Sequence, residues 1–530
     1  MNDNEIPITG KDLSLTDLDK EEISKQKKLF IALGISGILL LITVIIVVVA
    51  VRAGNSSSDE EEIDESKKIG EINCSYEIKT ISQAIMILGS NFSKKTDFDI
   101  VIKGKKVKYT KEIQFDSVGI NNVQFILYKD IEMDFMFQNV YTLIAVNMTS
   151  NKNAKILSMS NAFESCYLLQ EFNLNGFDTS QVKSLQKLFY KTSISKIDLS
   201  QFDTSNLKDI SYMFSTTRIS SIDFTNFDTS NVEDMSKLFE GCTSLLDINF
   251  NSTFFTTKNV KDLSHMFHGC DSLIDLDLSH FETNKVVNMS RMFQECISLT
   301  SIDISNFDTS NVEDMSYLFG NCENLKEINM KNINTKKVKT MSRMFSYCIS
   351  LEKIDLSNFD TSQVEDMSGM FSYCRKLSFL DMSNFKTNNV KDLSYMFSSC
   401  SSFHELKLSN FETNNVEKID HLFEDCSSLT SLDISNFNTE KVIDMSYIFQ
   451  GCNSLKQLNY NIDTKNVKDM NGMFSSCSAL SSLDLKNFNT KNALDMSYMF
   501  DYCTGLKNLD LSSFDTSSVT SMQNMFRKCS

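Results

Sequence analysis

The chain has 530 residues and carries 69 acidic against 52 basic side chains, which gives a formal net charge of −17 at pH 7. This balance argues against a nucleic-acid-binding protein, because contacts with phosphate groups need clustered lysine and arginine. The H-E-x-x-H, G-x-S-x-G and P-loop signatures do not occur in the sequence. We therefore expect that the chain is not an enzyme and that it has no catalytic residues and no cofactor.

An uncharged apolar run, residues 29–51, follows a tail of residues 1–28. The run is long enough to cross ~30 Å of hydrocarbon as a helix that rises ~1.5 Å per residue. A cleaved signal peptide is the alternative, but its apolar core would be shorter. Because lysines such as Lys27 and Lys28 precede the run, the positive-inside rule predicts a cytoplasmic tail and a single-pass type II protein of the plasma membrane with extracellular repeats.

Two segments connect this predicted transmembrane helix to the rest of the chain. Residues 52–68 are rich in Ser, Asp, Glu and Lys, a composition typical of a solvated acidic stalk. Residues 69–135 contain short runs of alternating apolar and polar side chains, which predict a strand-rich N-terminal cap region. A solenoid needs such a cap over the apolar side of its first coil.

From residue 136 to residue 530, one sequence unit recurs about every 26 residues. Its clearest copy runs from Leu299 to Cys322, and one phenylalanine position is kept in every copy from Phe137 to Phe526. A fixed period of this size indicates a stacked-repeat solenoid, because one unit cannot bury its apolar face without a neighbour. We expect about 15 coils.

The first half of each unit has the pattern of a strand. In the clearest copy, Ile302, Asp303 and Ile304 alternate between apolar and polar, which predicts a short strand whose aspartate faces away from the core. Stacked units would then align these strands in a parallel sheet on one face of the solenoid.

The second half of each unit has apolar residues at helical spacing. Val312, Leu318 and Phe319 lie at i, i+6 and i+7, and Ser310 with Glu313 forms the S-x-x-E signature of a capping box. We therefore predict an α/β solenoid with short helical or 3₁₀ turns on the face opposite the sheet.

The repeat carries a resemblance to a known family. The pattern L-x-x-I-x-I-x-x-F followed by F-x-x-C-x-x-L resembles a leucine-rich repeat, and N-F-D-T-S-x-V-x-D-M-S-x-M-F resembles the BspA-like family of bacterial surface proteins with a 26-residue repeat. The resemblance covers about three quarters of the chain. It implies a leucine-rich-repeat-like fold and a surface protein associated with adhesion, and it brings no catalytic residue with it.

A cysteine fills one position of most repeats, from Cys242 to Cys529, where earlier repeats have Val140, Thr192 or Thr217. A position that accepts valine and threonine is small and buried, so we expect free thiols that donate to backbone carbonyls. The alternative is bridging between adjacent coils, whose Cα atoms would lie about 5 Å apart. Cys74 and Cys166, outside this long column, are the best candidates for a disulfide.

The candidate binding site is the fifth position of the pattern L-x-x-I-x-I-x-x-F, which is Asp303 in the clearest copy. We expect it to form a ribbon of carboxylates spaced ~4.8 Å apart on the sheet face. The simpler interpretation is that these aspartates are solvated repeat residues, helped by hydroxyls such as that of Ser305. As a site, the ribbon would suit a cationic protein surface or divalent cations such as Ca²⁺. Its members are Asp198, Asp223, Asp277, Asp303, Asp355, Asp381, Asp433, Asp484 and Asp510.

No metal site is expected elsewhere, and we interpret His265 and His268 as solvated residues of a turn and not as a metal pair. Two functions remain. The first is a cell-surface recognition or adhesion protein whose extracellular solenoid binds a protein or glycan. The alternative is a structural component of a surface coat, assembled through contacts between solenoids.

Overall fold

The computed structural model describes residues 63–94 and 98–529. The predicted tail, the predicted transmembrane helix and most of the predicted stalk, residues 1–62, lie outside the described residues. Among the residues that are described, no helix is long and apolar enough to cross a membrane. Asp64–Ser530 forms one compact unit.

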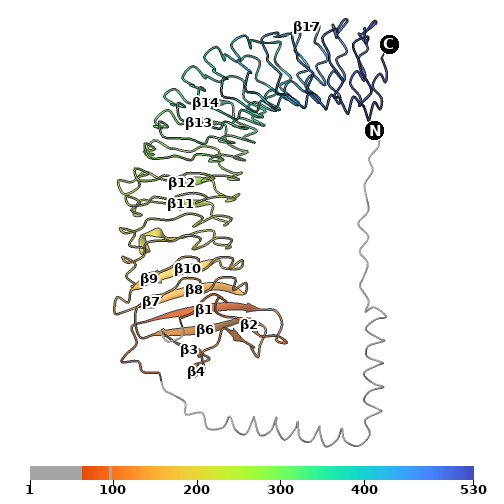
Figure 1. The fold of residues 1–530 in the computed structure, drawn as a ribbon. Helices are drawn as coiled ribbons and strands as arrows, with labels where there is room; N and C mark the ends of the chain where they lie inside the picture. The colour runs from red at the N-terminus through yellow and green to blue at the C-terminus, as the bar shows by residue number, and fades with distance from the viewer. Residues whose placement is uncertain (1–62, 95–97, 530) are drawn as a thin grey trace, which may run out of the picture. The chain divides into compact units, whose positions relative to one another are not determined.

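The N-terminal part of this unit is a mainly antiparallel sheet of six strands in the order β10-β8-β1-β6-β3-β4 (Figure 1). β1 pairs antiparallel with both β6 and β8, whereas β10 pairs parallel with β8. Because β8 and β10 are the first strands of the repeat region, this sheet covers the apolar side of the first coils. The strands are β1 (Gly70–Ile78), β3 (Phe98–Ile102), β4 (Lys105–Val107), β6 (Gly119–Leu127), β8 (Leu143–Ser150) and β10 (Glu171–Asn175).

Four further short strands pair around this sheet. β2 is antiparallel to β5, and β7 is parallel to β9. Their bounds are β2 (Ile85–Met86), β5 (Glu112–Ile113), β7 (Ile131–Glu132) and β9 (Ile156–Ser158).

The repeat region is a β-solenoid of about 13 coils, which lie side by side in sequence order (Figure 1). The expected number of coils was slightly higher. The strands of the first repeats, β8 and β10, belong to the N-terminal sheet. Equivalent strands of neighbouring coils pair in parallel, as β13 and β14 do through Ser301 with Glu327 and Asp303 with Asn329. These strands are β11 (Ser221–Asp223), β12 (Asp247–Asn249), β13 (Ser301–Asp303), β14 (Glu327–Asn329), β15 (Glu405–Leu406), β16 (Ser431–Ile434) and β17 (Gln457–Tyr460).

The predicted register of the strand is confirmed. Ile302 and Ile304 are buried, with 6% and 1% of their surface exposed, whereas Asp303 between them is exposed. Leu318 and Phe319 are also buried. A shift by one residue would have exposed the isoleucines and buried the carboxylate, so burial alone selects this register.

The prediction that the second half of each coil is helical is wrong. The only helix among the described residues is a 3₁₀ turn, η1 (Leu199–Gln201). In the coil after β13, a chain of tight turns takes the place of the helix: Leu318, Gly320 and Cys322 donate their N–H groups to the carbonyl three residues earlier.

The alternate residues of this segment donate to the next coil. The N–H groups of Tyr317, Phe319 and Asn321 bond to the carbonyls of residues 342, 344 and 346. Tyr317 and Asn321 adopt positive φ angles of 54° and 61°, which an α-helix does not allow. Consecutive turns therefore place apolar residues at nearly helical spacing. The N–H groups of alternate residues bond to the next coil and hold the coils together.

The core is a set of columns that run through the stack. The repeated phenylalanines lie one above another, with ring centroids 5.9 Å apart between Phe319 and Phe345 and 5.7 Å apart between Phe345 and Phe371. Both pairs are stacked. Each coil therefore buries its aromatic side chain against the coils on either side of it, as expected for a one-dimensional repeat protein.

Candidate binding surface: the aspartate ribbon

All of the predicted ribbon aspartates, from Asp198 to Asp510, are exposed. Those in paired strands lie in register with the equivalent residue of the next coil, as Asp223 does with Asn249 and Asp433 does with Asn459. Asp198 differs, because it caps η1. The structure thus places Asp223, Asp303 and Asp433 in strands, on their solvent side. The other ribbon aspartates occupy the equivalent position of their coils in backbone that forms no strand: Asp277, Asp355, Asp381, Asp484 and Asp510.

Each carboxylate in the ribbon is held by the backbone that follows it. Oδ1 of Asp303 accepts hydrogen bonds from the N–H of Ser305 at 2.8 Å and from its hydroxyl at 2.6 Å. The same pair of bonds joins Asp433 to Ser435. Aspartate forms such turns readily, because its short side chain reaches the backbone two residues further on.

These hydrogen bonds favour the charged form of several ribbon aspartates. The hydroxyl and the N–H of Ser305 lower the pKa of Asp303, because both stabilise the ionised carboxylate. Ser279 lowers the pKa of Asp277 in the same way. A lowered pKa means that the carboxylates of Asp277 and Asp303 stay ionised as the pH falls through the usual range for aspartate, so any role of their charge persists in mildly acidic media.

The order of residues along the ribbon limits like-charge repulsion. No three neighbouring coils carry aspartate in succession, because Asn173, Asn249, Asn329, Lys407 or Asn459 interrupts the row. Two carboxylates about 4 to 5 Å apart repel by about 1 kcal/mol in water. The asparagines also bind their neighbours.

Three such contacts between coils are present. Nδ2 of Asn329 donates to Oδ2 of Asp303 at 2.9 Å, and Asn249 and Asn459 donate to Asp223 and Asp433 at 3.0 Å each. Among the described residues, the second carboxylate oxygens of Asp277, Asp355 and Asp381 have no hydrogen-bond partner and remain available to a ligand.

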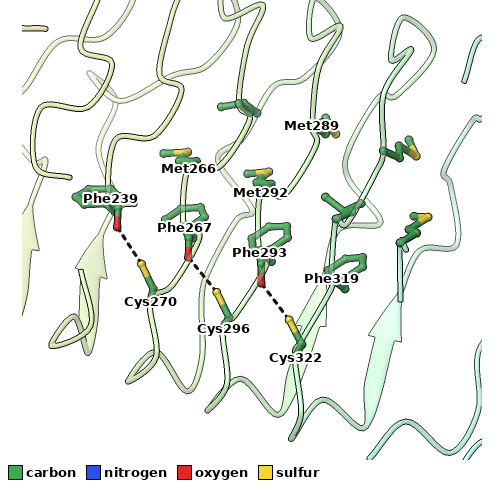
Figure 2. Close-up of a cluster of buried hydrophobic side chains, with 14 of the residues drawn as sticks. Phe239, Met266, Phe267, Cys270, Met289, Met292, Phe293, Cys296, Phe319 and Cys322 are labelled. Atoms are coloured by element: carbon green, nitrogen blue, oxygen red, sulfur yellow. Dashed lines mark hydrogen bonds between the residues drawn. The ribbon is translucent and has the colours of Figure 1, made fainter. Parts of the chain in front are cut away.

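The predicted column of free thiols is confirmed, and Cys74 and Cys166, the best candidates for a disulfide, are both free. Every cysteine is free, and all are buried except Cys529, which is half-buried. In Figure 2, Cys270, Cys296 and Cys322 point towards the carbonyl of the phenylalanine in the preceding coil. The Sγ of Cys322 lies 3.0 Å from the carbonyl oxygen of Phe293.

Cys166 is a member of this column and not an outlier. Its thiol donates to the carbonyl oxygen of Phe137 at 3.0 Å, the same contact that the later cysteines make. Its position three residues after Phe163 gives the F-x-x-C spacing of the later copies, so the sequence already contained this signal.

The thiols should be chemically inert in the folded chain. Burial raises the pKa of Cys242 to about 11 and that of Cys452 to about 12, and only the thiolate reacts. We expect a maleimide reagent at pH 8 to label the native chain at Cys529 alone and all 14 cysteines after unfolding, as counted by mass spectrometry. Rapid native labelling of Cys322 would contradict the buried column.

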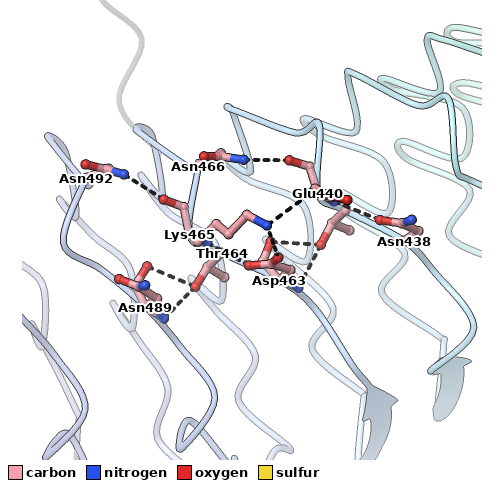
Figure 3. Close-up of polar contacts among 9 residues, drawn as sticks. Asn438, Glu440, Asp463, Thr464, Lys465, Asn466, Asn489 and Asn492 are labelled. Carbon is pink, nitrogen blue, oxygen red and sulfur yellow. Dashed lines mark hydrogen bonds and ion pairs between the residues drawn. The ribbon is translucent and has the colours of Figure 1, made fainter.

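A column of buried threonines was missed by the sequence analysis, which assigned only Ser310 and Glu313 of this segment a role, as a capping box. Figure 3 shows Thr464 beside Asn489 of the next coil. The Thr464 hydroxyl donates to the carbonyl oxygen of Asn489 at 3.1 Å and accepts the N–H of the same residue at 2.8 Å. This threonine therefore satisfies both backbone groups of one residue in the neighbouring coil, and Thr335 does the same for Asp360.

A second missed contact joins the coils at their edge. Nδ2 of Asn466 donates to the carbonyl oxygen of Glu440, and Asn492 donates to that of Lys465 (Figure 3). The Lys465 ammonium lies 3.1 Å from Glu440 and 3.3 Å from Asp463. The recurrence of Thr and Asn in the T-x-N-V pattern, as in residues 464–467, was the signal that could have revealed both columns.

The expectation that His265 and His268 are solvated is also wrong. Both side chains are half-buried, and Oε1 of Glu240 lies 3.5 Å from Nδ1 of His268. Sequence spacing pointed to the two histidines but could not show that Glu240 of the preceding coil lies beside them.

A sequence profile of the family described as "Mycoplasma protein of unknown function, DUF285" matches residues 131–248, 246–353, 323–432 and 418–530. A comparison with curated proteins finds no match. Among solved structures, the chain is similar to a leucine-rich repeat protein from Bacteroides ovatus, with 14% identity, a TM-score of 0.31, and 83% of this chain and 92% of that chain covered.

Two further solved structures are similar to the chain. A leucine rich cell surface protein from Faecalibacterium prausnitzii has 15% identity and a TM-score of 0.30, with 70% of this chain and 94% of that chain covered. A leucine-rich repeat protein from Eubacterium ventriosum has 15% identity and a TM-score of 0.30, with 69% of this chain and 92% of that chain covered.

Proposed function

Since the chain belongs to the repeat family described as "Mycoplasma protein of unknown function, DUF285", we propose that it is a cell-surface recognition protein. Its solenoid would bind a protein or glycan partner through the strand face. The observation that carries this proposal is the aspartate ribbon, which presents a row of exposed, oriented and ionised carboxylates.

The ribbon favours recognition for two physical reasons. Because each carboxylate is already held by the residue two positions on, as Asp355 is by the N–H of Ser357 at 3.0 Å, a ligand loses little side-chain entropy when it binds. Identical groups on successive coils also allow a ligand with several basic or hydroxyl groups to bind at several points at once. The net charge of −17 would steer a cationic partner towards the chain.

Assembly into a surface coat is the second candidate, and one observation favours it. Leu246 and Ile274 occupy the same position of neighbouring coils and expose 58% and 57% of their surface. Adjacent exposed apolar side chains can support a contact with a second copy of the chain.

One capture experiment separates the two candidates. The compact unit from residue 64 onwards is applied to intact cells, crosslinked and recovered. Recovery of a different protein or of a glycan, lost when the ribbon aspartates are replaced, supports recognition. Recovery of another copy of the chain alone supports assembly.

The proposal also needs the repeats to lie outside the cell. We propose that residues 29–51 span the plasma membrane once, with residues 1–28 in the cytoplasm, as the lysines before the apolar run indicate. Protease added to intact cells should then remove the repeats and leave a tag at the N-terminus intact, as judged by immunoblotting. If the repeats are protected from the protease and the tag is cleaved, the chain has the opposite orientation in the membrane.

A further inference from the structure

Two successive coils bring three potential metal ligands together. Glu240 follows Phe239, and His268 follows Phe267 in the equivalent position of the next coil. His265 lies three residues before His268. One ligand atom of each of Glu240, His265 and His268 lies within 4.8 Å of the other two, and this is the one such group of His, Cys, Asp and Glu found in residues 63–94 and 98–529.

The two nitrogens of His268 have different carboxylate neighbours. Nδ1 lies 3.5 Å from Oε1 of Glu240, and Nε2 lies 3.5 Å from Oε2 of Glu295. Two ligand atoms that each lie about 2.0 to 2.2 Å from a tetrahedral Zn²⁺ are about 3.4 Å apart. Nδ1 of His268 and Oε1 of Glu240 are thus already separated as two ligands of one ion would be. The Nε2–H group of His268 faces Glu295, and a carboxylate is a usual hydrogen-bond acceptor for a metal-bound histidine.

His265 supplies an independent observation. Both of its ring nitrogens are shielded from solvent, and neither has a hydrogen-bond partner among the described residues. Leaving a shielded polar atom unpaired costs about 1 to 3 kcal/mol. Its ring centroid lies 5.5 Å from that of His268, so a ligand near His268 is also within reach of His265.

The surrounding charges are mixed. Lys237 and Arg291 both act on His265, but they lie over the rings of Tyr212 and Tyr317, at 4.8 Å and 4.2 Å from the ring centroids. Arg291 also donates to Gln294. Glu240, Glu295 and Asp271 supply negative charge around His268, so the carboxylates offset the two cations.

We propose that Glu240, His265 and His268 bind one Zn²⁺ ion, with Glu295 as the positioning residue for His268. Two imidazole nitrogens and one carboxylate form a donor set that Zn²⁺ accepts, with a fourth position left for water or a group of a partner. The ion would join two neighbouring coils. This inference goes beyond the proposed recognition function, because the site does not include the ribbon.

The test is a titration of the full-length chain, purified in detergent and freed of metal, with ZnCl₂ by isothermal titration calorimetry. We expect saturable binding of one Zn²⁺ per chain and a melting temperature that rises with ZnCl₂ concentration. His265→Tyr and His268→Gln should abolish both effects. Glu295→Gln should weaken binding about tenfold, as loss of a partner behind a metal ligand typically does.

The repeat itself provides matched variants. Tyr212 and Tyr317 occupy the position of His265 in other coils, and Gln294 occupies that of His268, so both substitutions are compatible with the fold. His421→Tyr is the control, since it removes a histidine from the same position of a distant coil and should leave Zn²⁺ binding unchanged. Absence of saturable binding in the parent, or undiminished binding in both His265→Tyr and His268→Gln, would overturn the proposal.

Discussion

Replacing Phe345 with alanine should lower the free energy of unfolding by about 3 to 5 kcal/mol. The side chain is fully buried, and its ring stacks between Phe319 and Phe371 at 5.9 Å and 5.7 Å. Truncation removes the ring contacts on both sides and leaves a cavity that the rigid stack fills poorly. Urea unfolding followed by circular dichroism measures the loss.

The loss should be confined to the coils beside the substitution. Each coil contacts only its neighbours, so hydrogen exchange should accelerate around residues 319–371 and remain slow in distant coils. Phe379→Ala is the control, because that ring is 69% exposed and its removal should change stability by less than about 0.5 kcal/mol. Equal acceleration along the whole solenoid would refute the nearest-neighbour picture.

Thr335→Val should lower the free energy of unfolding by about 2 to 6 kcal/mol, although the side chains of threonine and valine have the same shape. The buried Thr335 hydroxyl donates to the carbonyl oxygen of Asp360 and accepts its N–H, both at 2.8 Å. Valine leaves these two backbone groups unpaired, and each costs about 1 to 3 kcal/mol. The same urea unfolding measures the change.

Thr335→Ser separates the hydroxyl from the methyl group. Serine keeps both hydrogen bonds and loses one methyl group, so we expect a loss of only about 1 kcal/mol. If serine destabilises the chain as much as valine does, the threonine column acts through packing and not through its hydrogen bonds.

The strand half of the repeat was predictable because its chemistry is local. A polar residue between two apolar ones selects one register, and Ile302, Asp303 and Ile304 obey it. The small buried cysteine position was predictable for a similar reason, since the same position holds valine or threonine in other copies. A period repeated this often also predicts stacking.

The turn half of the repeat could not be predicted from spacing. Consecutive tight turns and an α-helix both repeat apolar residues every three to four positions, and they differ only in where the N–H groups donate. The N–H of Tyr317 bonds to the carbonyl of Ser342 in the next coil, which no pattern within one repeat reveals. The cluster of Glu240 with His268 depends on the same stacking between coils.

The central claim is that the aspartate ribbon is a recognition surface, and one binding measurement tests it most directly. Asp277, Asp303, Asp355 and Asp381 are changed together to asparagine, which preserves shape and removes charge, and the affinity for the captured partner is measured over a range of salt concentrations. For a basic partner, we predict weaker binding by the variant and a smaller dependence on salt, with an unchanged melting temperature. Equal affinity and equal salt dependence of the parent and the variant would contradict the claim.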